Sequence, residues 1–291
     1  MALKTFVALT LILGWTLLPL PDARCADTLH IPASAIQSGL EDARSLVLRP
    51  DSLLIVSETG AGKISGFRVD VASADTPESI TMARVLEESG DCKIQEPDGL
   101  SWVADTRAAV ICQGTGQVYL LDNALRCMRS LSVPPWVPGG HTFMASDVAG
   151  NEFGELFVLD GSAQRVYHFD ANGAYLQHFI LEDMADPTRM IYYDKSLFIT
   201  DPAEGKVHAI TDDGNNLANI GIFPELMRVR IIDGTIWVLS GQAIHLFSIT
   251  GQHIGNLMPQ GPGDAIRDVA GSGDRVFLLT GGSLYFWNLS P

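Results

Sequence analysis

Several arginines occupy similar places in the sequence. Arg189, Arg228 and Arg267 recur at one equal interval, and each precedes a short apolar run; Arg44 precedes a similar run near the N-terminus. A guanidinium binds a carboxylate or phosphate through two parallel hydrogen bonds. If the runs are equivalent strands, we expect these arginines on one face, in a shared funnel that reaches solvent. They form either a site for an anionic ligand or structural pairs with carbonyl and carboxylate groups of neighbouring repeats.

Carboxylates accompany the arginines. We expect Asp147 or Asp268 close to at least one arginine, and their oxygens are ligands that calcium prefers. Few carboxylates are available as ligands at this place, so no cofactor is expected. A bound calcium ion is the alternative. His208 and His245 fall at a position where other repeats have Tyr, so we expect them to pack between repeats.

One loop carries side chains suited to ligand recognition. It contains Pro134-Pro135-Trp136-Val137-Pro138-Gly139-Gly140-His141. Loops on a rigid scaffold carry many binding residues. Trp136 and His141 are therefore candidate ligand-binding residues for a sugar or peptide; the alternative is that Trp136 packs between two repeats.

Cys92, Cys112 and Cys127 follow the N-terminal leader. In an oxidising compartment, three cysteines suggest one disulfide and one spare thiol. Cys112 ends a predicted second strand and Cys92 precedes the first strand of the same repeat, whereas Cys127 begins the fourth strand. This arrangement predicts a Cys92–Cys112 disulfide.

The element that must position these residues is a recurring pair of strands. An alternating apolar run, a polar turn and a second short run occur six times. The anchors of the second run are Ile64, Val118, Val166, Val207, Ile244 and Leu284. Their period of about 40 to 50 residues suits the four-stranded blade of a β-propeller. The first strands of the second and third repeats then begin near Gly99 and Ala145.

These residues also carry a family resemblance. Pro-x-Gly-Leu-x-Trp at 97–102, the run at 156–173 and Gly-Pro-Gly-Asp at 261–264 resemble NHL repeats. The resemblance implies an all-β fold, a six-bladed β-propeller with four antiparallel strands per blade. Propellers of this type include protein-binding, RNA-binding and carbohydrate-associated modules and a few lyases and lactonases, so the fold does not choose a function.

The sixth repeat ends without a fourth strand, and an unpaired sheet edge is unfavourable. Residues 28–31 alternate in polarity, so we expect this N-terminal segment to complete blade six and close the ring; the alternative is a frayed terminus. Residues 35–43 are expected to form at most a short turn.

Residues 1–25 have the layout of a secretory signal. Lys4 precedes an apolar run over residues 5–20, and small residues stand before a cut at Ala26. The alternative is an anchor that stays uncleaved. Residues 26–291 would then form a single NHL-like propeller with 17 basic and 33 acidic residues, a net charge of −16. Such a charge repels nucleic acid and anionic lipid.

The sequence therefore predicts a periplasmic or secreted monomer without a membrane span after signal removal. We expect a binding or scaffold propeller that engages a protein, peptide or glycan of the cell envelope through the face carrying the long loops between blades. The alternative is a hydrolase or lyase, lactonase-like or lyase-like, with a metal-assisted site at the mouth of the central channel.

Overall fold

The computed structural model describes residues 28–70, 79–86, 88–89, 92–104, 106–137, 143–261 and 263–289. The regular structure in these ranges is entirely β. The predicted signal lies outside the described residues. Within the described residues, no helix has the length and apolar character needed to cross a bilayer.

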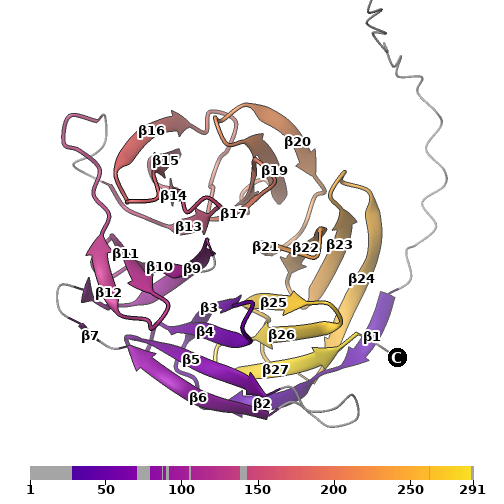
Figure 1. The fold of residues 1–291 in the computed structure, drawn as a ribbon. Coiled ribbons are helices and arrows are strands. Elements are labelled where there is room, and N and C mark those ends of the chain that lie inside the picture. Colours follow the sequence, from indigo (N-terminus) through magenta and orange to yellow (C-terminus); the bar gives the residue numbers. More distant parts are fainter. Residues whose placement is uncertain are drawn as a thin grey trace, which may run out of the picture.

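Six blades, each with four antiparallel strands, stand around a central axis, as the sequence predicts (Figure 1), and a fifth strand joins the sheet of blade five. Blade one contains β3 (Ala43–Leu48), β4 (Leu53–Glu58), β5 (Lys63–Asp70) and β6 (Ser79–Leu86); blade two contains β9 (Pro97–Val103), β10 (Arg107–Cys112), β11 (Gln117–Asp122) and β12 (Cys127–Ser130). Blade three contains β13 (Asp147–Gly150), β14 (Leu156–Asp160), β15 (Arg165–Phe169) and β16 (Tyr175–Ile180); blade four contains β17 (Arg189–Tyr193), β18 (Ser196–Asp201), β19 (Lys206–Thr211) and β20 (Asn216–Ile220). Blade five contains β21 (Leu226–Ile232), β22 (Thr235–Ser240), β23 (Ala243–Ser248) and β24 (His253–Gln260); blade six contains β25 (Asp268–Ser272), β26 (Arg275–Leu279) and β27 (Ser283–Asn288).

The core lies in the seams between blades. Side chains alternate across a strand, so each blade buries one face against each neighbour. Leu159 and Val166 of blade three, for example, pack with Leu197 and Ile199 of blade four. The six predicted anchor residues of the third strands are all fully buried. The apolar residues that repeat in the sequence are therefore those that pack one blade against the next.

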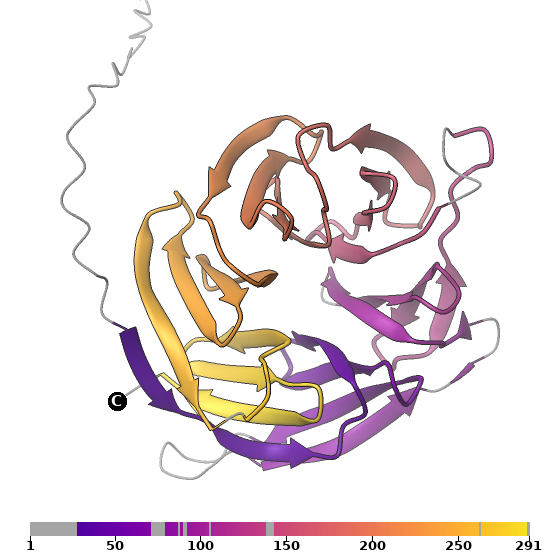
Figure 2. The same cartoon turned by 180° about the vertical axis from the view of Figure 1, so that it is seen from behind.

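The ring closes through the N-terminal segment, but not through residues 28–31. These residues belong to β1 (Thr28–Pro32), which pairs in parallel with β24 of blade five. The outer strand of blade six is β2 (Ser34–Ser38), antiparallel to β27, in the segment expected to form only a turn. Figure 2 shows both strands along the outside of blades five and six. The reason is packing: Ile36 of β2 contacts the core between blades six and one.

The disulfide prediction is wrong in its second partner. Cys92 of β8 (Cys92–Lys93), which pairs with β7 (Glu88–Ser89), is bonded to Cys127, with Cα atoms 5.8 Å apart. The segment that leads from blade one to blade two passes beside β12, the outer strand that begins at Cys127. Cys112 is the free thiol, buried in the seam between blades one and two.

Candidate functional site

The innermost strands place six residues, five of which carry a side chain, at one level of the central channel. Strand pairing fixes which residues correspond in five blades, because each stands opposite the same position near the end of its blade's second strand. In blade two, Gly99 falls at the register shift between the pairs Leu100–Val110 and Pro97–Cys112. In order of blades the ring reads Ser45, Gly99, Asp147, Arg189, Arg228 and Asp268. Arg189 and Arg228 are thus equivalent, as predicted. Arg267 and Arg44 are each one residue too early, and Asp147 takes the position expected near Ala145.

Asp268 is the centre of a buried cluster in this ring. Its Oδ2 accepts hydrogen bonds from Arg228 Nη1 at 3.0 Å and Arg230 Nη2 at 2.6 Å, and its Oδ1 accepts one from Arg230 Nε at 2.7 Å. Ser45 Oγ and the amides of Leu46 and Val269 donate to the same carboxylate. Burial acts to raise the pKa of Asp268, but the two arginines hold it below its ordinary value.

The arginines of this cluster have little contact with solvent. Arg228 is 2% exposed and Arg230 is 7% exposed. Burial lowers the pKa of Arg228 to about 10, against the opposing effect of Asp268, so this side chain remains charged at neutral pH. A buried guanidinium is tolerated only when carboxylates and hydrogen-bond acceptors surround it. The geometry is that of a structural ion cluster and departs from the solvent-reaching funnel expected from the sequence.

A second charged pair lies across the channel. Arg189 Nη2 donates to Asp98 Oδ2 at 2.9 Å, and Asp98 is 1% exposed. The Oδ1 atoms of Asp98 and Asp147 are buried without a hydrogen-bond partner. Burial raises the pKa of Asp147, although the three nearby arginines oppose the shift. The three carboxylates thus balance three guanidiniums: Asp98, Asp147 and Asp268 against Arg189, Arg228 and Arg230.

Arg44 and Arg267 form a separate group outside this cluster. Both contact Asp42: Arg44 Nη2 lies 2.8 Å from Oδ2, and Arg267 Nη1 lies 3.4 Å from Oδ1. All three side chains are about one-third exposed. They form an exposed ion pair network, and of the four predicted arginines only Arg189 and Arg228 lie in the buried ring.

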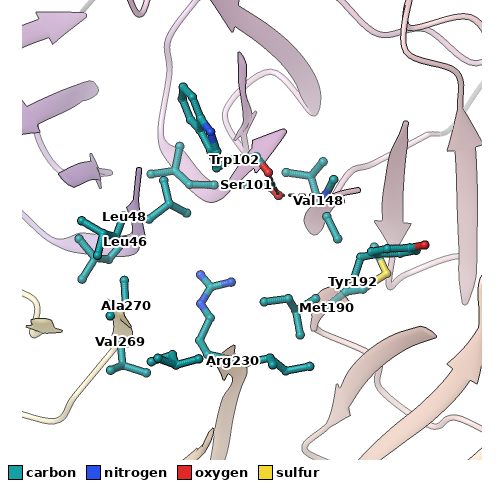
Figure 3. Close-up of a pocket in the computed structure, with 18 residues that line it drawn as sticks. Leu46, Leu48, Ser101, Trp102, Val148, Met190, Tyr192, Arg230, Val269 and Ala270 are labelled. Atoms are coloured by element: carbon teal, nitrogen blue, oxygen red, sulfur yellow. Dashed lines mark hydrogen bonds between the residues drawn. The ribbon is translucent and has the colours of Figure 1, made fainter. Parts of the chain in front are cut away.

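The channel widens beyond the ion cluster into a pocket of about 220 Å³. Its walls come from all six inner strands, and most of the lining residues are apolar by type, including Leu46, Trp102, Met190 and Tyr192. In Figure 3 the Arg230 guanidinium points toward the middle of this pocket. Sequence reasoning missed Arg230. The signal was its position two residues after Arg228, which puts both side chains on the same side of the strand.

Of the two predicted loop residues, Trp136 lies away from the channel site. Trp136 is 76% exposed, and its ring contacts Tyr175 of the outer strand β16, with centroids 5.9 Å apart. Val133 and Val137, on either side, are buried in the seam between blades two and three. Trp136 therefore lies at the outer rim on an anchored loop. His141 lies outside the described residues.

The metal prediction at Asp147 and Asp268 remains a prediction. Asp268 already accepts six hydrogen bonds through its two oxygens. A cation at Asp268 would have to displace two guanidinium groups. Asp147 has one unpartnered oxygen, but this atom rests against the Gly99 backbone, so closely that a Cβ added to the glycine would overlap it.

Comparisons with known proteins support the architecture. No family profile and no curated protein sequence matches the chain. The solved structure of U3-55K is similar, with a TM-score of 0.65 at 9% identity, covering 89% of this chain and 98% of that one. A putative gluconolactonase matches with a TM-score of 0.65 at 13% identity over 89% and 92% of the two chains. Virginiamycin B lyase from Staphylococcus aureus matches with a TM-score of 0.59 at 12% identity over 85% and 80%.

At these identities the likeness shows the fold alone. The chain is a six-bladed β-propeller whose structural neighbours include WD40-repeat and lactonase- or lyase-like proteins. The finer resemblance to NHL repeats stays a prediction.

Proposed function

We propose that this chain is an exported binding propeller, and that it engages a protein, peptide or glycan through the long loops between its blades. The observation that carries the proposal is the charge balance of the channel. Three buried carboxylates face three buried or largely buried guanidiniums, and Asp268 is saturated by hydrogen bonds. This arrangement stabilises the ring and leaves the arginines engaged with protein groups.

The binding surface is the rim around Trp136. Trp is enriched among the residues that dominate binding energy, and Trp136 is the most exposed aromatic side chain among the described residues. Val133 and Val137 hold the loop in the seam, so Trp136 is presented from an anchored position. Its edge contact with Tyr175 leaves most of the ring free to contact a partner.

Export is supported by the disulfide. Bonds such as Cys92–Cys127 persist in oxidising compartments and are rare where thiols are kept reduced. Together with the signal-like sequence of residues 1–25, this favours a partner in the envelope or outside the cell.

The alternative, a hydrolase or lyase at the channel mouth, needs an arginine and carboxylates that are free to contact a substrate. The exposed Arg44 and Arg267 share Asp42, and the buried arginines are paired. The channel geometry therefore favours binding at the rim over catalysis at the axis.

The experiment is affinity capture from envelope extract with the wild-type chain, Trp136→Ala and Phe153→Ala. Phe153 is 68% exposed in the turn between β13 and β14, so it is a matched exposed aromatic away from this loop. We expect a partner that the wild type and Phe153→Ala retain and that Trp136→Ala binds at least tenfold more weakly. Equal capture by all three chains, or capture by none, would overturn the proposal.

A further inference from the structure

A group of metal-type side chains lies at the hairpin between β18 and β19 of blade four. His208 Nε2 is 3.9 Å from Asp201 Oδ2 and 3.8 Å from Glu204 Oε2. One ligand atom from each of the three residues lies within 4.8 Å of the others. Among the residues that the structure describes, this is the single such group of three or more His, Cys, Asp or Glu side chains.

His208 supplies an independent indication of a ligand. The residue is 3% exposed, and its Nε2 is buried without a hydrogen-bond partner. Nearly all buried polar atoms in proteins have a partner, so an orphaned one needs an explanation. Both neighbouring carboxylate oxygens are too distant for a hydrogen bond, yet Nε2 faces them across a gap suited to an ion.

Blade three shows what the same hairpin looks like without these side chains. Asp160 of blade three corresponds to Asp201, and both accept a backbone amide from the preceding loop, Met144 at 3.0 Å and Ala185 at 2.6 Å. This shared role explains Asp201 as part of the fold. It does not explain Glu204 and His208, the two metal-type residues that are present in blade four and absent from blade three.

Those two additions stand where blade three has other residues. Glu204 corresponds to Ala163, and His208 corresponds to Tyr167. Glu204 forms an exposed ion pair with Lys206, at 2.9 Å. A pair of this kind contributes little to stability. Blade four therefore carries an imidazole and a second carboxylate that the fold of the hairpin does not require.

We propose that Asp201, Glu204 and His208 bind one Zn²⁺ ion. Zinc takes His nitrogen at about 2.0–2.1 Å and carboxylate oxygen at about 2.0–2.2 Å, which sets tetrahedral ligand atoms about 3.4 Å apart. The separations of 3.8 and 3.9 Å from His208 Nε2 to the two carboxylates need only a small closure, and all three ligand atoms lie within 4.8 Å of one another. A neutral imidazole and two carboxylates compensate the charge of the ion.

The surroundings suit a cation that enters from solvent. Glu204 is 36% exposed whereas Asp201 is fully buried, so the fourth coordination position lies toward the surface beside Glu204. Asp183, on the loop after β16, adds a further negative charge that acts on His208. Lys206 would turn away from Glu204 into solvent. Calcium and magnesium prefer sites made entirely of oxygen, so the buried imidazole favours zinc over these two ions.

The test is calorimetric titration of the purified, untagged chain with Zn²⁺ after treatment with a chelator, with metal analysis of the dialysed complex. We expect one zinc per chain, a raised melting temperature with zinc, and no competition from Ca²⁺ or Mg²⁺. Glu204→Ala and His208→Tyr copy the residues of blade three, so both are expected to fold. Each should weaken zinc binding at least tenfold.

His245→Tyr is the matched control. His245 holds the same repeat position in blade five, but its Nδ1 is bonded to Asn256 at 2.8 Å, and its substitution should leave zinc binding unchanged. The absence of saturable zinc binding, or wild-type affinity in Glu204→Ala, would overturn the proposal. If His208→Tyr does not fold, Glu204→Ala decides alone, because Glu204 lies at the surface. Neither result bears on the partner proposed for Trp136.

Discussion

Asp147 and Asp268 occupy equivalent positions three blades apart, and each accepts a hydrogen bond from the inner strand of the next blade. The Met190 amide donates to Asp147 Oδ2 at 2.8 Å, and the Leu46 amide donates to Asp268 Oδ2 at 2.7 Å. Inner strands are sheet edges with one row of unpaired amides. Each of the two carboxylates therefore satisfies an inner-strand amide of the next blade, but their electrostatic surroundings differ.

Asp268→Asn should destabilise the protein strongly. The change removes the carboxylate that pairs with both Arg228 and Arg230, and breaking a buried ion pair from one side costs about 3–5 kcal/mol. Asp42→Asn, at the exposed mouth, should cost less than about 1 kcal/mol. Urea denaturation of both variants checks the difference, and equal losses would contradict a buried cluster at Asp268.

Asp147→Asn should change the free energy of unfolding at neutral pH by less than about 1.5 kcal/mol, since Oδ1 of Asn can still accept the Met190 amide. The pKa of Asp147 is raised in the folded state, so the folded protein binds more protons than the unfolded chain above about pH 4. The contribution of Asp147 to stability is therefore full below its ordinary pKa of 3.8 and falls as pH rises through the raised value. Relative to Asp147→Asn, the wild type should gain stability on acidification. The measurement is the free energy of unfolding of both proteins as a function of pH. Profiles that run parallel for the wild type and Asp147→Asn would contradict the raised pKa of Asp147.

Gly99→Ala should cost about 1–3 kcal/mol, the usual range for overpacking. An added Cβ would meet Asp147 Oδ1 inside contact distance. Most of the loss should disappear in the Asp147→Ala background, where that oxygen is absent. Gly263→Ala, with no neighbour within 4 Å of its added Cβ, is the neutral control. Additive losses in the double variant would show that the two residues do not touch.

Non-reducing peptide mapping should link Cys92 to Cys127 and leave Cys112 free. The bond joins residues 35 apart, and closing a loop of that length is worth about 3–4 kcal/mol by the chain-entropy model. Cys127→Ser should lose stability of this order. Burial raises the pKa of Cys112 to about 11 from 9.0, so native Cys112 should resist alkylation until the pH approaches 11. Rapid alkylation of the native thiol at pH 9 would contradict its burial.

Deletions at the N-terminus should separate the roles of the two first strands. Removing residues 26–33 takes away β1, which adds to the outer edge of blade five, whereas removing residues 26–39 also takes away β2. We expect a modest fall in melting temperature for the first deletion and a much larger one for the second, because blade six then lacks its fourth strand. Thermal denaturation of both deletions checks this, and similar curves would argue against closure by β2.

The sequence predicts the blades better than the site because core patterns repeat and polar details do not. Ile64, Val166 and Leu284 are buried in every case because each must fill a seam. Equal spacing of the arginines is misleading, since the strand position that matches Arg228 in blade six lies one residue beyond Arg267. A slip of one residue turns a side chain to the other face. That slip puts Asp268 in the ring and leaves Arg267 at the mouth.

Other features of the site and fold depend on contacts between different blades, which no local sequence pattern contains. Arg230 matters because Asp268 of the next blade reaches it, and Cys127 is bonded to Cys92 because an inter-blade segment passes beside β12. The exposure of Trp136 depends on how Val133 and Val137 fill the seam below it.

The pairing of β2 with β27 also sets the order in which this molecule can be completed. Ser34 pairs with Phe286, so strands from opposite ends of the described chain must meet. During synthesis β2 emerges long before β27, and contacts of such separation form slowly. A chain that lacks β27 leaves β2 without its partner, so the edge of this strand is exposed. Biogenesis therefore needs β2 to be protected until β27 has been made, and chains that end before β27 should aggregate instead of forming a five-bladed product.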